Sequence, residues 1–167
     1  MGFVFFALKM KTALGQNIIQ VGFFKNTSSC YYCQKYAHVE LRFSDGTATS
    51  ITRYPGRVHY IANKQMSNPN YSCFFQIYLD PMEEFHLRAY ADEFQDETFS
   101  VFAMYWNFFV RCFPINYGMF CSKYIAMLLQ RIHFCKELNP LTATPDHVFE
   151  SLARDERTVV SYNKLLL

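Results

Sequence analysis

The sequence predicts an α+β fold in which an antiparallel β-sheet packs against helices. Segments rich in strand formers fill the first half of the chain, and segments with helical periodicity follow them. Turn residues between two of the strand segments favour a hairpin, and therefore antiparallel pairing. The chain has 167 residues, 51% of them hydrophobic, and neither a linker nor an internal repeat. We therefore expect a single domain over residues 1–167.

The N-terminal third leaves alternatives open. The segment "GFVFFALKM" (2–10) is compatible with a strand, and "LGQNIIQVGFF" (14–24) fits either a short helix or a second strand. Two further segments, "NTSSC" (26–30) and "NKQMSNPN" (63–70), have the composition of turns or loops.

The middle of the chain is predicted to form strands. "AHVELRF" (37–43) alternates polar and apolar residues, and "SDG" (44–46) supplies turn chemistry. "TATSITRY" (47–54) is then the returning strand. "RVHYIA" (57–62) either extends that strand or forms another after a Pro-Gly break, and "YSCFFQIYL" (71–79) is the last strand expected.

The first two helices are predicted over residues 80–112. Asp80 is a typical N-cap, Pro81 suits the first helical position, and Glu83 completes a capping box. The apolar face of this helix is formed by Leu87, Tyr90, Ala91 and Phe94. Residues 99–112 are expected to form a second, buried helix, with a strand as the alternative.

Two more helices are predicted in the last third of the chain. One runs from about Cys121 to Cys135 and is ended by the Asn139-Pro140 pair. The other, in "TPDHVFESLAR", opens with Thr144 as N-cap and Pro145 after it.

Composition argues against several classes of protein. A formal net charge of +2, with no lysine- or arginine-rich run, argues against nucleic-acid binding. The longest apolar run, residues 99–110, is too short to cross a bilayer. The start of the chain lacks the features of a secretory signal. The myristoylation motif requires Ser or Thr at position 6, where this chain has Phe6. We therefore expect a cytoplasmic protein whose six cysteines are reduced.

Cys121 stands at the predicted start of a helix. It shares one face of that helix with an apolar stripe, Tyr124, Ile125, Leu128 and Ile132. The stripe should pack on the sheet, so the thiol should face the sheet where the helix begins. Unpaired backbone N–H groups and the helix dipole stabilise a thiolate there, and the same N–H groups suit a tetrahedral oxyanion. The alternative is that Cys121 is a small buried apolar residue.

A cysteine nucleophile needs a base, and His38 is the strongest candidate. It is followed two residues later by Glu40, and side chains two apart on a strand point to the same face. Glu40 would orient the imidazole or stabilise its charged form. The alternative is an ordinary polar face of a half-buried strand. Among the other histidines, His59 remains open, His86 and His147 fall in polar helical patterns, and His133 lies too far along the Cys121 helix.

These motifs resemble the circularly permuted NlpC/P60 papain-like superfamily, and within it the YiiX-like group of bacterial, phage and viral proteins. The resemblance rests on "AHVELRFSDG", "SIT", "FCSKYIAMLLQ" and "NPLTATPDHVFESL", and it spans roughly residues 37–153. Members carry the histidine strand early and the cysteine helix late, which is the reverse of the order in papain.

The resemblance implies a permuted papain-like fold and a cysteine hydrolase that needs no cofactor. Cys121 would be the nucleophile, His38 the base and Glu40 the third polar residue, with Ser50, Thr52 or His59 as alternatives for the third place. It implies an amide, thioester or ester bond in a peptide, protein or lipid-acyl substrate. Lys123 departs from the pattern, because glutamate is common at that position in the group.

Two other interpretations compete with a hydrolase. Cys30, Cys33 and His38 have the C-x2-C-x4-H spacing that opens a zinc knuckle, but Phe43 stands where the fourth ligand is expected. Cys73 or Cys112 would then complete the zinc site through the fold. The last alternative is an inactive scaffold that binds other proteins through its tyrosine-rich loops.

Overall fold

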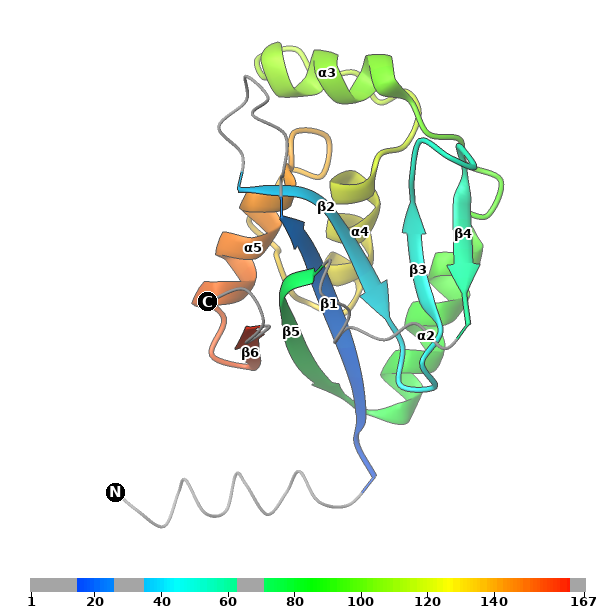
Figure 1. Cartoon of the computed structure of the whole chain (residues 1–167), viewed down its shortest axis with the longest axis vertical. Helices are drawn as coiled ribbons and strands as arrows, with labels where there is room; N and C mark the ends of the chain where they lie inside the picture. The colour runs from blue at the N-terminus through cyan, green and yellow to red at the C-terminus, as the bar shows by residue number, and fades with distance from the viewer. Residues whose placement is uncertain (1–14, 26–34, 63–70, 163–167) are drawn as a thin grey trace.

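The computed structural model describes residues 15–25, 35–62 and 71–162, and in this part of the chain it shows an α+β fold (Figure 1). Six strands form one antiparallel sheet in the order β4-β3-β2-β1-β5-β6, accompanied by four helices. The strands are β1 (Asn17–Lys25), β2 (Tyr36–Arg42), β3 (Ala48–Ile51), β4 (Val58–Ile61), β5 (Tyr71–Leu79) and β6 (Thr158–Tyr162). The helices are α2 (Pro81–Asp92), α3 (Val101–Phe109), α4 (Cys121–Arg131) and α5 (Pro145–Arg154).

For residues 14–24 the sequence left a short helix and a strand as alternatives, and the structure shows a strand. This strand, β1, lies at the centre of the sheet between β2 and β5. Ile19, Val21 and Phe23 are fully buried on the face that the helices cover. Apolar residues at every second position suit a strand with one buried face, and the partner strands on both sides stabilise this segment as a strand rather than a helix. The strand considered for 2–10 and the loops considered for 26–30 and 63–70 lie outside the described residues.

The predicted hairpin is present, but its ladder is short. Gly46 takes a positive φ of 90° in the turn, and β2 pairs with β3 only at Leu41↔Thr49 and Arg42↔Ala48. The two strands therefore part on the N-terminal side of Leu41. Val39 lies in this gap, where its backbone groups have no partner in the β2–β3 ladder. The segment 57–62 forms a separate strand, β4, rather than an extension of β3.

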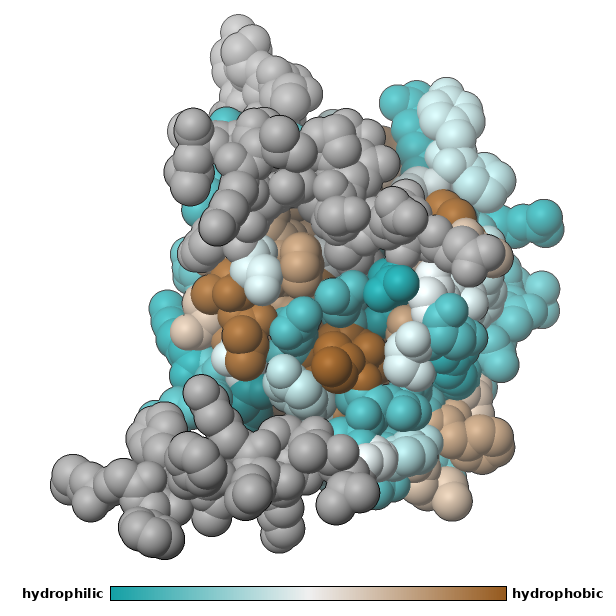
Figure 2. Space-filling view, turned by 60° about the horizontal axis from the view of Figure 1, so that its bottom comes forward, coloured by the Kyte–Doolittle hydropathy of each residue, from teal (hydrophilic) through white to brown (hydrophobic). Residues whose placement is uncertain are grey.

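Helices α4 and α5 pack against one face of the sheet, behind the strands in Figure 1. Phe149 of α5 contacts the rings of Phe23, Tyr36 and Phe75 at centroid distances of 5.5, 4.8 and 5.2 Å. The other face of the sheet is less buried, as Ile18 with 39% of its surface exposed illustrates. Figure 2 looks obliquely at that side and shows hydrophobic patches among hydrophilic ones.

Helix α2 begins as predicted. The carboxylate of Asp80 accepts a hydrogen bond from the N–H of Met82 at 2.8 Å, and that of Glu83 accepts from the N–H of Asp80 at 2.9 Å. This reciprocal pairing satisfies donors that the first turn of a helix otherwise leaves open.

The prediction of a buried helix over 99–112 is wrong in its burial and its length. Helix α3 covers Val101–Phe109, and only Ala103 and Asn107 in it are buried. Phe102 and Phe109 are 64% and 61% exposed. The aromatic residues recur with the spacing of a buried stripe, but here the stripe faces outward. Helix α3 instead turns the side chain of Asn107 inward. Its amide accepts a hydrogen bond from the N–H of Ile115 and donates one to the C=O of the same residue.

The third helix ends earlier than the predicted Cys135. Helix α4 stops at Arg131, and the next residues form a tight turn in which His133 and Cys135 have positive φ values of 67° and 52°. The N–H of Phe134 folds back onto the C=O of Leu129 at 2.9 Å. Such a turn terminates a helix by satisfying its last carbonyls, and neither Gly nor Pro announces it in the sequence.

The N-terminal end of β2 is attached to the first turn of α5. The carboxylate of Asp146 accepts hydrogen bonds from the N–H groups of Lys35 and Tyr36 at 2.8 and 2.9 Å. This contact fixes the strand that carries His38 relative to the helix layer.

Replacing Asp146 with alanine should lower the free energy of unfolding by about 2 kcal/mol, because two backbone donors lose a charged acceptor. Urea unfolding followed by circular dichroism would measure the change. Glu150→Ala on the same helix is the matched control. Among the described residues it makes one ion pair, an exposed one with Arg154 at 3.7 Å, so its effect should stay below about 0.5 kcal/mol. Equal losses in the two variants would contradict the role given to Asp146.

Candidate active site

Helix α4 begins differently from the other described helices. A side-chain oxygen of Asp80, Ser100 or Thr144 accepts from the first turn of α2, α3 and α5, respectively. Phe120 occupies the N-cap position of α4 and provides no such bond. The positive end of the α4 dipole is therefore left to other acceptors.

The sulfur of Cys121 is one of these acceptors. The thiol is buried, with 6% of the residue exposed, and the backbone groups of Val39 and Ser122 help to lower its pKa. Ser122 belongs to the first turn of α4, whereas Val39 lies in the gap where β2 and β3 part. The short hairpin ladder thus leaves an N–H group free to approach the sulfur.

His38 reaches the same gap from β2. Its Nε2 atom lies 3.0 Å from the Oγ of Ser50 on β3 and 3.8 Å from an oxygen of Glu40. Glu40 is nearly fully buried, whereas 20% of the His38 side chain is exposed. The ring of Phe24, on the neighbouring strand β1, packs beside the imidazole at a centroid distance of 5.3 Å. The imidazole is therefore confined by groups from three strands.

The hydroxyl of Ser50 lies between two neighbours, the C=O of Val39 at 3.2 Å and Nε2 of His38 at 3.0 Å. Because it has a single proton, a hydroxyl that donates to the carbonyl accepts from Nε2, and the neutral ring then carries its hydrogen on Nε2. Glu40 on the same side favours that arrangement. In that tautomer Nδ1 has no proton and can accept one.

Electrostatics couple Cys121 to His38. Burial alone would lower the pKa of His38, but the charge and hydrogen bond of Cys121, followed by those of Glu40, outweigh it and raise the pKa to about 9. Burial would raise the pKa of Cys121, but the charge and hydrogen bond of His38 and the two backbone N–H groups outweigh it and lower that pKa. The shifts have the signs expected for a thiolate–imidazolium pair.

The remaining candidates for the third residue have other hydrogen-bond partners, although His59 is paired across β3 and β4 with Ser50. The hydroxyl of Thr52 donates to the C=O of Tyr54, and the Nδ1 of His59 contacts the C=O of Arg57 at 3.3 Å. Each of these contacts is local to its own turn or strand. Of the side chains proposed for the third place, Glu40 and Ser50 are those that the structure brings to His38.

The described residues offer little to a zinc site. Cys30 and Cys33 lie outside them, and the residues that are described contain no cluster of three His, Cys, Asp or Glu side chains able to hold a metal. Cys73 is buried with its sulfur 3.4 Å from the hydroxyl of Tyr36, and Cys112 is exposed. His38, which the zinc hypothesis requires as a ligand, is engaged with Ser50, Glu40 and Cys121.

Two residues next to Cys121 support the site in ways that sequence reasoning missed. Ser122 donates to the C=O of Ala143 at 2.6 Å, and Lys123 donates to Asn116 at 3.0 Å and to the C=O of Gly118 at 2.8 Å. Both are buried despite their polarity. They hold the first turn of α4 to the segments before and after it. Their position beside the cysteine was the only signal available in the sequence.

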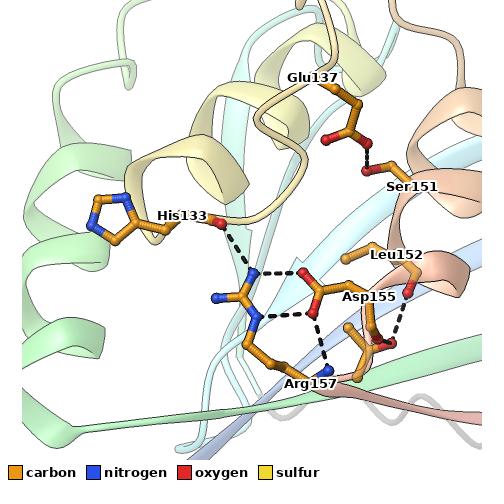
Figure 3. Close-up of polar contacts among 7 residues, drawn as sticks. His133, Glu137, Ser151, Leu152, Asp155 and Arg157 are labelled. Carbon is orange, nitrogen blue, oxygen red and sulfur yellow. Dashed lines mark hydrogen bonds and ion pairs between the residues drawn. The ribbon is translucent and has the colours of Figure 1, made fainter.

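A second polar cluster lies at the other end of α4 (Figure 3). Arg157 donates to the C=O of His133 and to the carboxylate of Asp155, and Ser151 donates to Glu137. Figure 3 shows the imidazole of His133 pointing away from this cluster. The guanidinium and its neighbouring carboxylate are paired with each other, so the cluster serves to close the turn after α4 onto the strand β6.

The comparisons add no relative. Neither the protein-family models, nor the curated proteins, nor the solved structures contain a match to this chain.

Proposed function

We propose that this protein is a cysteine hydrolase that cleaves an amide, thioester or ester bond. The observation that carries the proposal is the Cys121–His38 pair, with pKa shifts in opposite directions, at a helix start that has no side-chain cap. A cysteine that served only as a buried apolar residue would have a raised pKa, as Cys135 has, at about 11.

In the first half of the reaction, the Cys121 thiolate attacks the carbonyl carbon of the substrate. The oxygen of that carbonyl becomes an oxyanion beside the start of α4, where the N–H of Cys121 itself is the nearest donor by position. The tetrahedral intermediate collapses, the bond to the leaving group breaks, and His38 transfers its proton to that group. The product is a thioester between Cys121 and the acyl part of the substrate.

In the second half, His38 is neutral and acts as a base. It takes a proton from a water molecule, whose oxygen attacks the thioester carbonyl. Collapse of the second intermediate releases the acid and regenerates the thiolate–imidazolium pair. Glu40 and Ser50 hold Nε2 throughout, so that the ring presents Nδ1 to the sulfur and to the water.

We further propose a permuted papain-like fold of the NlpC/P60 type, because the histidine strand precedes the cysteine helix along the chain. Papain-like sites pair a helix-terminal cysteine with a histidine on a strand, and the polar neighbours of His38 suit the third position of that arrangement. The same chemistry occurs on unrelated folds, so the proposed activity rests on the site and not on the fold.

The test is active-site titration with a cysteine-directed electrophile such as a peptide vinyl sulfone. One equivalent of probe should attach near neutral pH, and peptide mapping should locate it on Cys121 out of the six cysteines. Labelling spread over several cysteines at similar rates would contradict the proposal and favour an inactive binding scaffold.

Ser50→Ala should lower kcat/KM by about tenfold, because Nε2 of His38 loses one of its two partners. Steady-state kinetics with the best substrate of a small acyl library would measure this. Thr52→Ala removes a hydroxyl from the adjacent segment that bonds only locally, and it should leave kcat/KM unchanged. If the two variants behave alike, the imidazole is not oriented by Ser50.

A further inference from the structure

Helix α3 lies at one end of the molecule (Figure 1), and most of its aromatic side chains are exposed. Residues 102, 105, 106 and 109 follow the i, i+3, i+4, i+7 spacing of one helical face, and two more exposed aromatic residues follow in the loop after the helix. The members and their exposed fractions are Phe102 64%, Tyr105 41%, Trp106 38%, Phe109 61%, Phe113 76% and Tyr117 69%. We call this set the α3 aromatic surface. Single exposed aromatic residues are ordinary, but six gathered along one helix and its loop mark an interaction site.

The charge pattern around this surface suits an apolar partner. No charged residue occurs in 98–110, and an arginine stands near each end of that run. Arg57 is bridged to Thr98, and Arg111 donates to the C=O of Phe108 at 3.3 Å. Asp96 and Glu97 also precede the run, so attraction to an anionic surface is a minor contribution beside apolar burial.

The polar groups beneath the surface are already satisfied within the protein. The indole N–H of Trp106 donates to the C=O of Phe113 at 3.0 Å, and the amide of Asn107 bonds twice to Ile115. The N–H of Val110 donates to the C=O of Trp106 at 2.7 Å. A segment with these bonds in place can enter a less polar medium without leaving its donors unpaired, and a bilayer imposes that requirement more strictly than a protein partner does.

The surface is also continuous with the candidate active site. Phe108, on the less exposed side of α3, packs edge to face on Phe120 at a centroid distance of 5.4 Å, and Phe120 directly precedes Cys121. The N–H of Ser100 donates to the C=O of Met119 at 2.8 Å. The helix that carries the α3 aromatic surface is therefore packed on the segment that leads into Cys121.

We propose that the α3 aromatic surface docks the protein on the surface of a phospholipid bilayer. No helix in the described ranges has the length and hydropathy needed to cross a bilayer, and α3 has nine residues. The helix would lie along the interface with its aromatic side chains among the headgroups and upper acyl chains, as interfacial helices do. Tyr and Trp, each with an apolar ring and a polar atom, are the residues that favour this depth.

The chain contains a probe of this docking, because Trp106 is its only tryptophan. Adding phosphatidylcholine vesicles should shift the emission of Trp106 to shorter wavelength, and brominated lipids should quench it. Including phosphatidylserine should strengthen binding by at most about fivefold, the contribution of about one basic residue, since Asp96 and Glu97 offset part of the charge of Arg57 and Arg111. Vesicle flotation would give the partition coefficient.

Phe102→Ser combined with Phe113→Ser should reduce the partition coefficient by about tenfold or more for each ring removed. Phe85→Ser is the matched control, because Phe85 is 63% exposed on α2 and lies outside this surface. Cys121→Ala should bind vesicles as the wild type does, so the docking can be tested whether or not the protein is a hydrolase. Circular dichroism would check that each variant folds.

The proposal is overturned if wild-type emission and flotation do not respond to either vesicle composition. It is overturned equally if Phe85→Ser weakens binding as much as the double variant does. Concentration-dependent dimerisation that the double variant abolishes, without vesicle binding, would assign the surface to a second copy of the chain instead.

Discussion

Cys121→Ala is expected to abolish turnover, with kcat falling by on the order of 10⁶-fold, as for the loss of other catalytic nucleophiles. The reason is that every proposed step forms or breaks a bond to this sulfur. Fast labelling by the vinyl sulfone should disappear together with turnover, because Cys73 and Cys135 are buried with raised pKa values and the exposed Cys112 should react only slowly. Mass spectrometry of the intact protein would follow the adduct.

Cys112→Ala is the control for this experiment. Cys112 is exposed, so it is open to slow alkylation, and replacing it leaves the packing of the core unchanged. This variant should retain full turnover and one equivalent of fast labelling. Turnover that survives in Cys121→Ala would mean that the thiol at the head of α4 is a structural residue.

The strands and capped helices could be predicted because their signals are local. Alternation in 37–43 and the capping box around Asp80 each depend on a few neighbouring residues, and the structure contains both. The end of α4 is not of this kind. His133 and Cys135 adopt positive φ values without Gly or Asn, in a turn stabilised by tertiary contacts such as the bond from Arg157 to the C=O of His133.

The outward face of α3 was missed for a different reason. Periodicity identifies which residues share a face of a helix, but not whether that face meets the core or the solvent. Here Asn107, at a position opposite the aromatic stripe, is needed inside because it pairs with both backbone groups of Ile115. The asparagine in the middle of an otherwise apolar helix was the one feature of the sequence which indicated that the aromatic stripe faces the solvent.

The candidate site was partly predictable. The types and spacing of His38 and Glu40 place them on one face of a strand, and a helix start after Phe120 places Cys121 against the sheet. Sequence could not supply the gap between β2 and β3. That gap depends on where the ladder stops, and it is what allows Ser50 and Val39 to contact His38 and Cys121.

His38→Ala is expected to lower kcat/KM by about 10²- to 10⁴-fold, the usual contribution of a general acid–base group. It should also change how labelling depends on pH. In the wild type, the lowered pKa of Cys121 gives a thiolate below the ordinary thiol pKa of 9, and the imidazolium persists up to about pH 9. Turnover should therefore fall as pH rises through about 9, while alkylation, which needs only the thiolate, should not.

Without His38, the charge that lowers the pKa of Cys121 is gone, and burial, the largest influence, raises it. The thiolate would then form only in more alkaline solution, so alkylation of His38→Ala should be slow at pH 7 and recover as pH rises. Rates of iodoacetamide labelling between pH 5 and pH 10 would measure this profile. His59→Gln is the control, because within the described residues the imidazole of His59 contacts the C=O of Arg57 and neither Cys121 nor His38. Identical profiles for wild type and His38→Ala would show that the imidazole does not ionise the thiol, and the proposed pair would fail even if Cys121 were reactive.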